Sequence, residues 1–202
     1  MMNLKNRPAF FLLILSFLIG CTGKKSKSDI DIEFVQDTLN VGYTYWWPES
    51  GPFIGQCGDE LSLVFSGTLI NLQPATDDAG PLYTSQKGTI EIERVYTIKD
   101  LGEDTYANQQ FITTDCFDGL DLRTGDRVLV FCYDYEGGYT LPGGKSILKI
   151  SGAEDPLITS VRRYIDLDQN AMELKKDVGL WAEKGLGRKL QDIITCHEAS
   201  RN

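Results

Sequence analysis

The chain has 202 residues, with 29 acidic against 20 basic side chains and a formal net charge of −9 at pH 7. An acidic chain without a basic stripe lacks the clustered Lys and Arg that contact phosphates, so nucleic acid is not an expected partner. Its single histidine, and five cysteines of which none forms a C-x-x-C pair, argue against a zinc site, and we predict no metal or other cofactor.

The first twenty residues have the composition of an export signal. Lys5 and Arg7 precede an apolar run, residues 9–20, that only Ser16 interrupts. Twelve residues are too few to cross a bilayer as a helix, which takes about 20 residues. The sequence therefore predicts a signal peptide at residues 1–20.

The apolar run ends in Leu18-Ile19-Gly20-Cys21, which resembles the lipobox of bacterial lipoproteins. The resemblance implies cleavage before Cys21, diacylglycerol on its sulfur and usually a further acyl chain, such as palmitate, on its amine. Two or more chains anchor a protein stably, at about 0.8 kcal/mol per buried methylene. We expect a protein held by lipid in the bacterial cell envelope. The alternative is a secretory signal with an incidental cysteine.

Residues 21–31 are predicted to be a flexible tether between the lipid and the folded domain, because they are polar and show no apolar period. Lys24, Lys25 and Lys27 would lie beside anionic headgroups. Thr22 stands where an Asp signals inner-membrane retention in some bacteria, so we expect the outer membrane.

An aromatic segment follows the tether and contains Tyr43, Tyr45, Trp46 and Trp47. Tyr and Trp are enriched at the centres of binding interfaces, so these four are candidate ligand-binding residues. Aromatic rings also bury large areas wherever they can, and packing over one end of a sheet explains the same residues. We favour packing and keep binding as the alternative.

The middle of the chain alternates apolar and polar residues as strands do. Residues 61–72 predict a long strand whose Gly67 permits a bulge or bend. Residues 89–99 predict a second strand with an irregularity near Arg94, and 127–135 one that is covered on both faces because nearly every position is apolar. Shorter strands are expected at 31–35, 111–114 and 147–150, and a long loop at 73–88.

The last third of the chain predicts helices. Asp155 followed by Pro156 is a typical helix start, and Asn170 three residues before Glu173 has capping-box spacing. An apolar face follows each of these two helix starts. The final face contains Leu190, Ile193 and Ile194.

Residues 57–150 resemble the barrel of the tissue inhibitors of metalloproteinases and related netrin-type modules. The resemblance rests on a cysteine before the first long strand, the glycine within it, and the Cys116-Phe-Asp-Gly-Leu and Gly125-Asp-Arg-Val-Leu-Val segments. It implies a mainly β fold with an OB-like five-stranded barrel, which we place at 32–154. The helices predicted after it would form an extension at 155–202 packed on that barrel. The family inhibits metalloproteinases through a free N-terminal cysteine in a Cys-x-Cys start, which this chain lacks, so that mechanism is not expected here.

Four cysteines remain once Cys21 is acylated, and in an exported chain they predict two disulfides with three possible connectivities. The family resemblance implies Cys57–Cys196. That pairing leaves Cys116–Cys132 across adjacent strands.

Two further groups of residues resemble sites of chemistry. Asp166, Asp168, Asn170 and Asp177 have the spacing of a calcium loop, but Ala171 replaces the turn glycine, and helix capping is the preferred explanation. His197 follows Cys196, and we expect an oxidised cysteine at a frayed terminus instead of a nucleophile–base pair.

The function expected from these features is a non-catalytic one. We predict a membrane-anchored binding or interaction module of the envelope, with another envelope protein as its partner. The alternatives are a protease inhibitor that acts through a barrel loop, and an envelope hydrolase with a carboxylate-based site.

Overall fold

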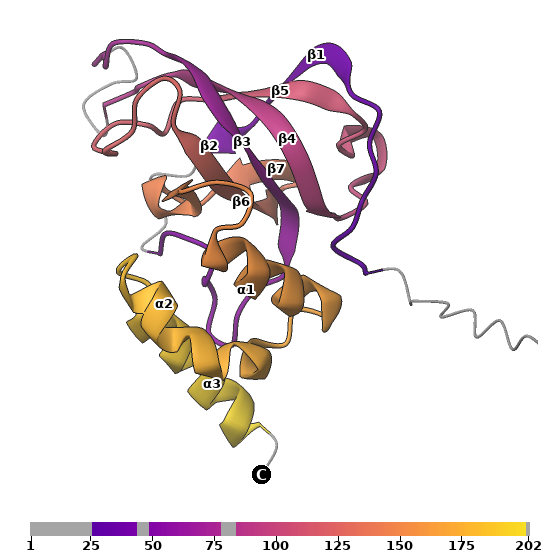
Figure 1. Ribbon diagram of the computed structural model, residues 1–202, viewed down its shortest axis with the longest axis vertical. Helices are drawn as coiled ribbons and strands as arrows, with labels where there is room; N and C mark the ends of the chain where they lie inside the picture. Colours follow the sequence, from indigo (N-terminus) through magenta and orange to yellow (C-terminus); the bar gives the residue numbers. More distant parts are fainter. Residues whose placement is uncertain (1–25, 44–48, 78–83, 201–202) are drawn as a thin grey trace, which may run out of the picture.

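The computed structural model describes residues 26–43, 49–77 and 84–200. A curved sheet lies above a group of helices, and the C-terminus lies at the far end of the helices (Figure 1). The strands are β1 (Val35–Asn40), β2 (Gly42–Tyr43), β3 (Leu61–Leu72), β4 (Gly88–Ile98), β5 (Gln109–Thr114), β6 (Arg127–Tyr135), β7 (Gly138–Leu141) and β8 (Ile147–Ile150). The prediction of a mainly β fold with a C-terminal helical region is confirmed.

The strands form one sheet in the order β1-β5-β4-β3-β6-β7-β2, and β8 pairs with β6 off this path. Its two parallel pairs are β1 with β5 and β2 with β7, while the others are antiparallel. One short segment, 35–43, therefore supplies both end strands. This strand order does not confirm the expected five-stranded barrel, because the described residues contribute more strands than that.

The helical region contains α1 (Pro156–Asp166), the 3-10 helix η3 (Ala171–Asp177), α2 (Val178–Ala182) and α3 (Gly187–Ala199); the 3-10 turns η1 (Gly102–Asp104) and η2 (Gly144–Ser146) lie earlier. Both predicted caps are present: Asp155 accepts from the Leu157 amide at 3.0 Å, and Asn170 from the Met172 amide at 3.1 Å. Within the described part of the chain, no helix has both the length and the apolar character to cross a membrane.

Apolar side chains cover both faces of the sheet and form two separate cores. β6 shows the division: Val128, Val130 and Cys132 join the core on the inner face of the curved sheet, and Leu129, Phe131 and Tyr133 join the core shared with the helices. Side chains of a strand alternate between faces, so a strand covered on both sides must be apolar throughout. The prediction for this strand is confirmed.

Trp181 of α2 lies at the centre of the core between sheet and helices and is 1% exposed. Its ring meets Phe53 edge-on, with ring centroids 4.8 Å apart. The indole Nε1 donates to the Ser160 hydroxyl at 3.0 Å, and that hydroxyl donates to the Asp177 carboxylate at 2.7 Å. The large apolar ring is thus buried with its polar atom satisfied.

The edge strand predicted at 31–35 is wrong in position, because β1 begins where that prediction ends. Ile30, Ile32 and Phe34 are partly buried against the inner core without forming a strand. β1 itself has mostly exposed positions and so lacks an apolar alternation that could have marked it.

Gly67 lies where the backbone of β4 leaves no room for a side chain on β3. A Cβ atom at this position would come within 2.2 Å of the Glu91 carbonyl oxygen. The pairing of β3 with β4 shifts register between Ser66 and Gly67, opposite Arg94 and Ile92. The predicted bulge at Gly67 and the irregularity near Arg94 are both confirmed, and they are one feature.

We predict that Gly67→Ala lowers the free energy of unfolding by about 1–3 kcal/mol, because the backbone of β4 must move to admit the methyl group. Urea denaturation of the purified domain measures the change. Gly179→Ala is the matched control: nothing lies within 4 Å of the added atom in α2, so stability should stay the same or rise by up to about 1 kcal/mol. Equal effects of the two variants would contradict the packing argument.

Candidate functional site

A cavity of about 410 Å³ opens at the junction of the sheet and the helices. Asp59 and Glu60 line it just before β3, Tyr164 and Asp168 line it from the end of α1, and His197 lines it from α3. Its size is within the range of small-molecule sites. It is larger than two other cavities, of about 290 and 260 Å³, and is our candidate site.

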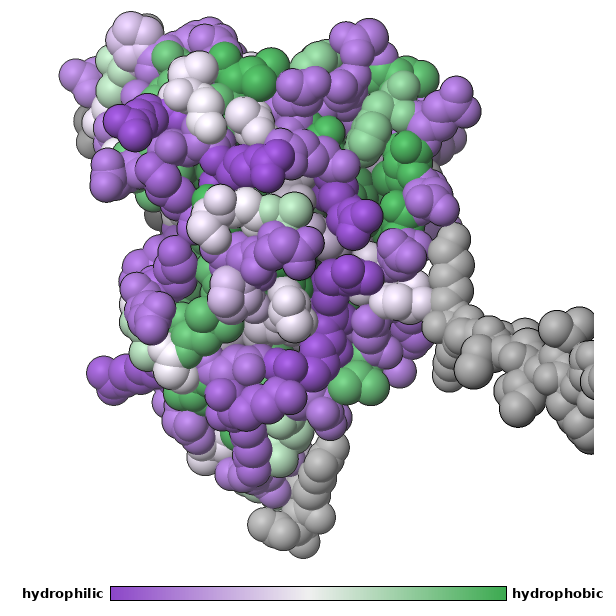
Figure 2. Space-filling view, viewed as in Figure 1, coloured by the Kyte–Doolittle hydropathy of each residue, from purple (hydrophilic) through white to green (hydrophobic). Residues whose placement is uncertain are grey.

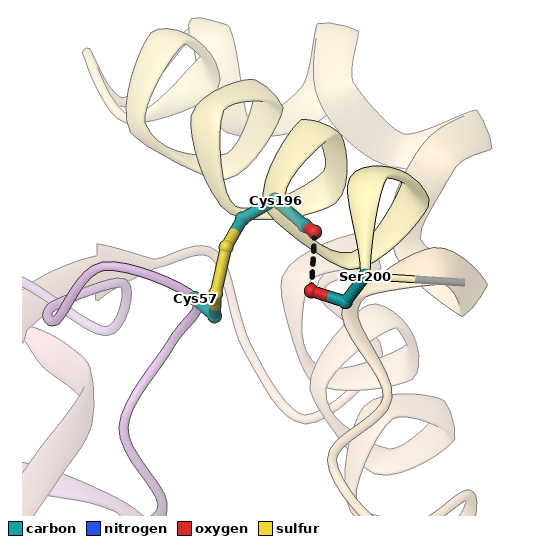
Figure 3. Close-up of a disulfide and its surroundings, with 3 residues drawn as sticks. All are labelled: Cys57, Cys196 and Ser200. Carbon is teal, nitrogen blue, oxygen red and sulfur yellow. Dashed lines mark hydrogen bonds between the residues drawn. A yellow bond between two sulfur atoms is a disulfide. The ribbon is translucent and has the colours of Figure 1, made fainter. Parts of the chain in front are cut away.

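A disulfide fixes one wall of this cavity. Cys57 and Cys196 are bonded, with Cα atoms 5.3 Å apart and a sequence separation of 139, so the loop before β3 is held against α3 (Figure 3). The Ser200 hydroxyl donates to the Cys196 carbonyl at 3.0 Å and closes the last turn of the helix. The predicted pairing of Cys57 with Cys196 is confirmed.

A glutamine side chain that also lines the cavity is bonded to the start of β3. The Gln169 amide oxygen accepts from the Leu61 backbone N–H at 2.8 Å, and its nitrogen donates to the Leu61 carbonyl at 3.3 Å. Asp168 and Gln169 both have left-handed backbone angles, with φ of +56° and +54°. The turn that ends α1 is thereby attached to the first residue of β3.

The N-terminal segment is bound to α1 beside the cavity. The Ser26 hydroxyl donates to both carboxylate oxygens of Asp166, at 2.7 and 2.6 Å, and the Ser28 amide donates to the same carboxylate at 2.8 Å. Ser28 is fully buried, and its hydroxyl accepts from Arg162 Nε at 3.2 Å. The described part of the predicted tether is therefore docked on the domain. The prediction of a flexible spacer does not extend to these residues.

The charge of Asp166 is stabilised in this arrangement. Burial alone would raise the pKa of its carboxyl group, but the hydrogen bonds from Ser26 and Ser28 and the nearby Arg162 outweigh burial and lower the pKa. The ionised form is thus the one that holds the segment.

The polar side chains that line the cavity differ in whether they already have an ion-pair or hydrogen-bond partner. Lys27 forms an ion pair with Asp168, and Lys99 lies 3.6 Å from Glu60. Tyr164 is only 5% exposed, and burial raises the pKa of its hydroxyl to about 12. Among the described residues, the buried side-chain atom that lacks a hydrogen-bond partner is Ser62 Oγ, which does not line this cavity. The carboxylates of Glu60 and Asp168 at the rim are already paired with lysines.

Most of the predicted anchor and ligand-binding residues fall outside the described residues, namely Cys21, Tyr45, Trp46 and Trp47. Tyr43 ends β2, where its backbone pairs with Leu141 of β7. The aromatic contribution to binding stays a prediction.

The predicted second disulfide, Cys116–Cys132, is wrong for this structure: both residues are free, buried cysteines. They belong to the inner core, where burial raises the pKa of the Cys116 thiol to about 12 and raises that of Cys132 further. An apolar core favours the neutral thiol. Cysteine counting missed this because an even number of cysteines does not reveal which side chains point into a core.

The residues of the suspected calcium loop are each engaged elsewhere. Asp166 holds the N-terminal segment, Asp168 pairs with Lys27, Asn170 caps η3, and Asp177 bonds Ser160 and Arg163. No group of three potential metal ligands occurs in the described part of the chain. Helix capping, the preferred explanation, is confirmed for Asn170.

His197 is not at a frayed terminus, since α3 continues to Ala199. The helix places its side chain along the cavity. Its neighbour Cys196 is oxidised, as expected. Sequence analysis missed this role because no local pattern shows that the end of α3 lies beside the start of β3.

No family model matches this chain, and no curated protein matches it either. The functional argument therefore rests on the residues themselves. The features that carry it are the motif at Cys21, the docked segment and the cavity.

We predict that removing the disulfide with paired Cys57→Ala and Cys196→Ala substitutions lowers the free energy of unfolding by up to about 5 kcal/mol, because the bond closes a long loop in the unfolded chain. Denaturant unfolding without reductant measures this loss. Reduced wild-type protein should match the double variant. Cys116→Ala, which removes a free thiol, should lose less, and an unchanged stability on reduction would contradict the prediction.

We predict that Asp166→Asn releases the N-terminal segment, because the charged acceptor of Ser26 and Ser28 is lost. The protection factor of the Ser28 amide, measured by hydrogen exchange, should fall at neutral pH. Because the folded pKa of Asp166 is lowered, its contribution is present above the unfolded value of about 3.9 and is lost as pH falls through the folded pKa. The variant and the wild type should therefore converge in acid.

Asp168→Asn is the control for this experiment. It removes only the ion pair with Lys27, whose two side chains are 56% and 83% exposed. Exposed pairs contribute little, so the Ser28 protection factor should hardly change. Equal loss in both variants would show that charge alone, and not the bonded Asp166 acceptor, holds the segment.

Proposed function

We propose that this protein is a lipid-anchored protein of the bacterial envelope whose folded domain acts as a binding module close to the membrane. The observation that carries the proposal is Cys21 at the end of the apolar run, in the Leu18-Ile19-Gly20-Cys21 pattern of a lipobox. Two or more acyl chains on that residue would hold the domain stably.

The docking of Ser26 on α1 limits how far the domain could lie from an acylated Cys21. Only four residues lie between Cys21 and Ser26, which is bound to α1. The five Cα–Cα steps from Cys21 to Ser26 span at most about 18 Å when fully extended. An acylated Cys21 would therefore keep the end of α1 beside the bilayer, and with it the cavity that Lys27 helps to line.

The surface supports attachment through lipid instead of through the domain itself. On the face shown in Figure 2, hydrophilic residues predominate and apolar ones lie in small separate groups. The large exposed apolar side chains of the described residues are Val35, Ile70 and Leu167, which come from different elements. Scattered apolar residues of this kind are ordinary on a protein surface.

We propose contact and not catalysis as the work of the cavity. Nucleophilic catalysis needs a nucleophile within hydrogen-bond reach of a base. Beside His197 the cysteine is oxidised, and the two described free thiols belong to the inner core. The carboxylates at the rim, Glu60 and Asp168, already have lysine partners.

We also propose that the sheet is a variant of the OB-like barrel that the family resemblance implies. Two observations support this: β3 pairs with both β4 and β6 and bends at Gly67, and the segment 35–43 pairs with β5 through β1 and with β7 through β2. A strand that bends at a glycine can serve two parts of a small barrel. The fold by itself assigns no function.

We predict that Cys21→Ser moves the protein from the membrane fraction to the soluble fraction, because the acceptor thiol is lost. Mass spectrometry of the wild type should find cleavage before Cys21 and added acyl mass on that residue. Cys116→Ser is the control, and it should remain with the membrane. Wild-type protein with an unmodified Cys21 would overturn the proposal.

A further inference from the structure

We infer that a second cavity, the pocket between β4 and α1, binds a phosphate group, and that on the membrane this group is the phosphate of an anionic phospholipid. The pocket has a volume of about 290 Å³ and shares no lining residue with the candidate site. The phosphate chemistry rests on this pocket alone, which combines Arg94 and Arg162 with a buried pair of hydroxyls. The lipid source of the phosphate rests on the proposed function.

The pair of hydroxyls is the first observation. Ser66 of β3 and Tyr96 of β4 both line the pocket and are buried, at 6% and 2% exposure. Their oxygens lie 2.9 Å apart, and no other hydrogen bond of either hydroxyl occurs among the described residues. One bond uses only one of the two O–H donors. Because buried donors almost always have an acceptor, the second O–H indicates an acceptor that enters the pocket.

Two arginine side chains are the second, independent observation. The guanidinium group of Arg94 on β4 has no ion-pair partner among the described residues. Arg162 of α1 donates through Nε to the Ser28 hydroxyl at 3.2 Å, which leaves other N–H groups of its fork for a ligand. Burial raises the pKa of the Tyr96 hydroxyl, and the charges of both arginines act in the opposite direction. Both charges therefore lie near the hydroxyl pair.

The carboxylates that line the same pocket do not cancel this charge. Glu93 accepts from the Thr68 hydroxyl at 2.7 Å and pairs with Arg127 at 3.2 Å, so its charge is already neutralised. Glu154 is exposed and has no ion-pair partner among the described residues. Two arginines thus share the pocket with one unpaired carboxylate.

The arrangement of donors favours a tetrahedral anion. Arg94 comes from β4, Arg162 from α1 and the hydroxyl pair from β3 and β4, so the donors approach from different elements. A phosphate group offers oxygens in more directions than a planar carboxylate, and guanidinium forks bind phosphate through two parallel hydrogen bonds. The two arginines are far apart in sequence, so the chain needs no basic stripe to form a site for a single phosphate.

The docked segment brings this pocket close to the proposed anchor. Arg162 is bonded to Ser28, and the seven Cα–Cα steps from Cys21 to Ser28 span at most about 25 Å. Under the proposed function, phospholipid headgroups are therefore phosphates at high local concentration beside the pocket. An anionic headgroup fits better than a zwitterionic one, because the latter would bring a further cation to two arginines.

Inorganic phosphate tests the binding chemistry, with the full chain carrying Cys21→Ser and nitrogen-15 in its arginine side chains. The Nε–H signals of Arg94 and Arg162 should shift as phosphate is added at constant ionic strength, with a dissociation constant on the order of 1 mM, since Arg94 is exposed. Acetate should shift both signals far less. Equal shifts with acetate would overturn the assignment to phosphate.

Two variants and one control locate the site, with the Arg162 signal as the readout. Arg94→Gln should weaken phosphate binding about tenfold, because it removes a charged donor. Glu154→Gln should strengthen binding about twofold, because it removes the unpaired carboxylate. Arg188→Gln removes the same charge from an exposed position on α3 outside the pocket and should leave the affinity unchanged. Equal affinity in wild type and Arg94→Gln, or equal losses in Arg94→Gln and Arg188→Gln, would overturn the inference.

The source of the phosphate is tested with the acylated chain in bilayer nanodiscs without added phosphate. Both arginine signals should shift in phosphatidylcholine discs that contain phosphatidylglycerol, relative to phosphatidylcholine alone, and Arg94→Gln should abolish the shift of Arg162. A shift with inorganic phosphate only would overturn the headgroup source and assign a soluble phosphate. No shift in either arm would overturn the pocket as a phosphate site. Failure of acylation, seen by mass spectrometry, would overturn the proposed function while the inorganic phosphate arm still decides the chemistry.

Discussion

The burial of both faces of β3 and β6 is the constraint on which the rest of the structure depends. β6 is apolar on consecutive positions, so its two rows of side chains need two separate covers. The curved sheet supplies one cover by folding over its own inner face, and the C-terminal helices supply the other. The helices are therefore part of the same folding unit as the sheet, because without them Leu129 and Phe131 would face water.

The candidate site results from the way in which the C-terminal helices are attached to the sheet. Helices that pack on a sheet need connections at their ends, and three such connections converge on one place: the Cys57–Cys196 bond, the Gln169 bonds to Leu61, and the docking of Ser26 on Asp166. Each joins residues far apart in sequence. The cavity lies between them, so its walls are fixed even though its carboxylates are exposed. A rigid frame of this kind positions ligand groups at little entropic cost on binding.

Sequence predicted those parts of the structure that follow from local periodicity. The alternation at 61–72, the continuous apolar run of β6, and the caps at Asp155 and Asn170 all act within a few residues, and all were found. The Cys57–Cys196 bond came from a resemblance to a known family and not from periodicity.

The parts that sequence missed depend on contacts between distant residues. β1 is a polar strand held by backbone pairing with β5, so no hydrophobic pattern marks it. Ser26 and Ser28 form a typical spacer by composition, and only an acceptor 138 or more positions away makes them part of the domain. The free thiols of Cys116 and Cys132 were missed for the same reason, because their burial in the inner core depends on how the whole sheet curves.

A weak site and a short tether make physical sense together. A cavity whose charges are exposed and partly neutralised cannot bind a small charged ligand tightly, since each exposed ion pair contributes at most about 1 kcal/mol. Lipid on Cys21, as proposed, would hold Ser26 within about 18 Å of the bilayer and would raise the effective concentration of membrane-bound ligands, to the millimolar range or above for short linkers. Under that condition weak contacts would be enough. The docking of Ser26 and Ser28 then matters as much as the cavity, because a longer free tether would let the domain move away and lose the effective concentration on which a weak site depends.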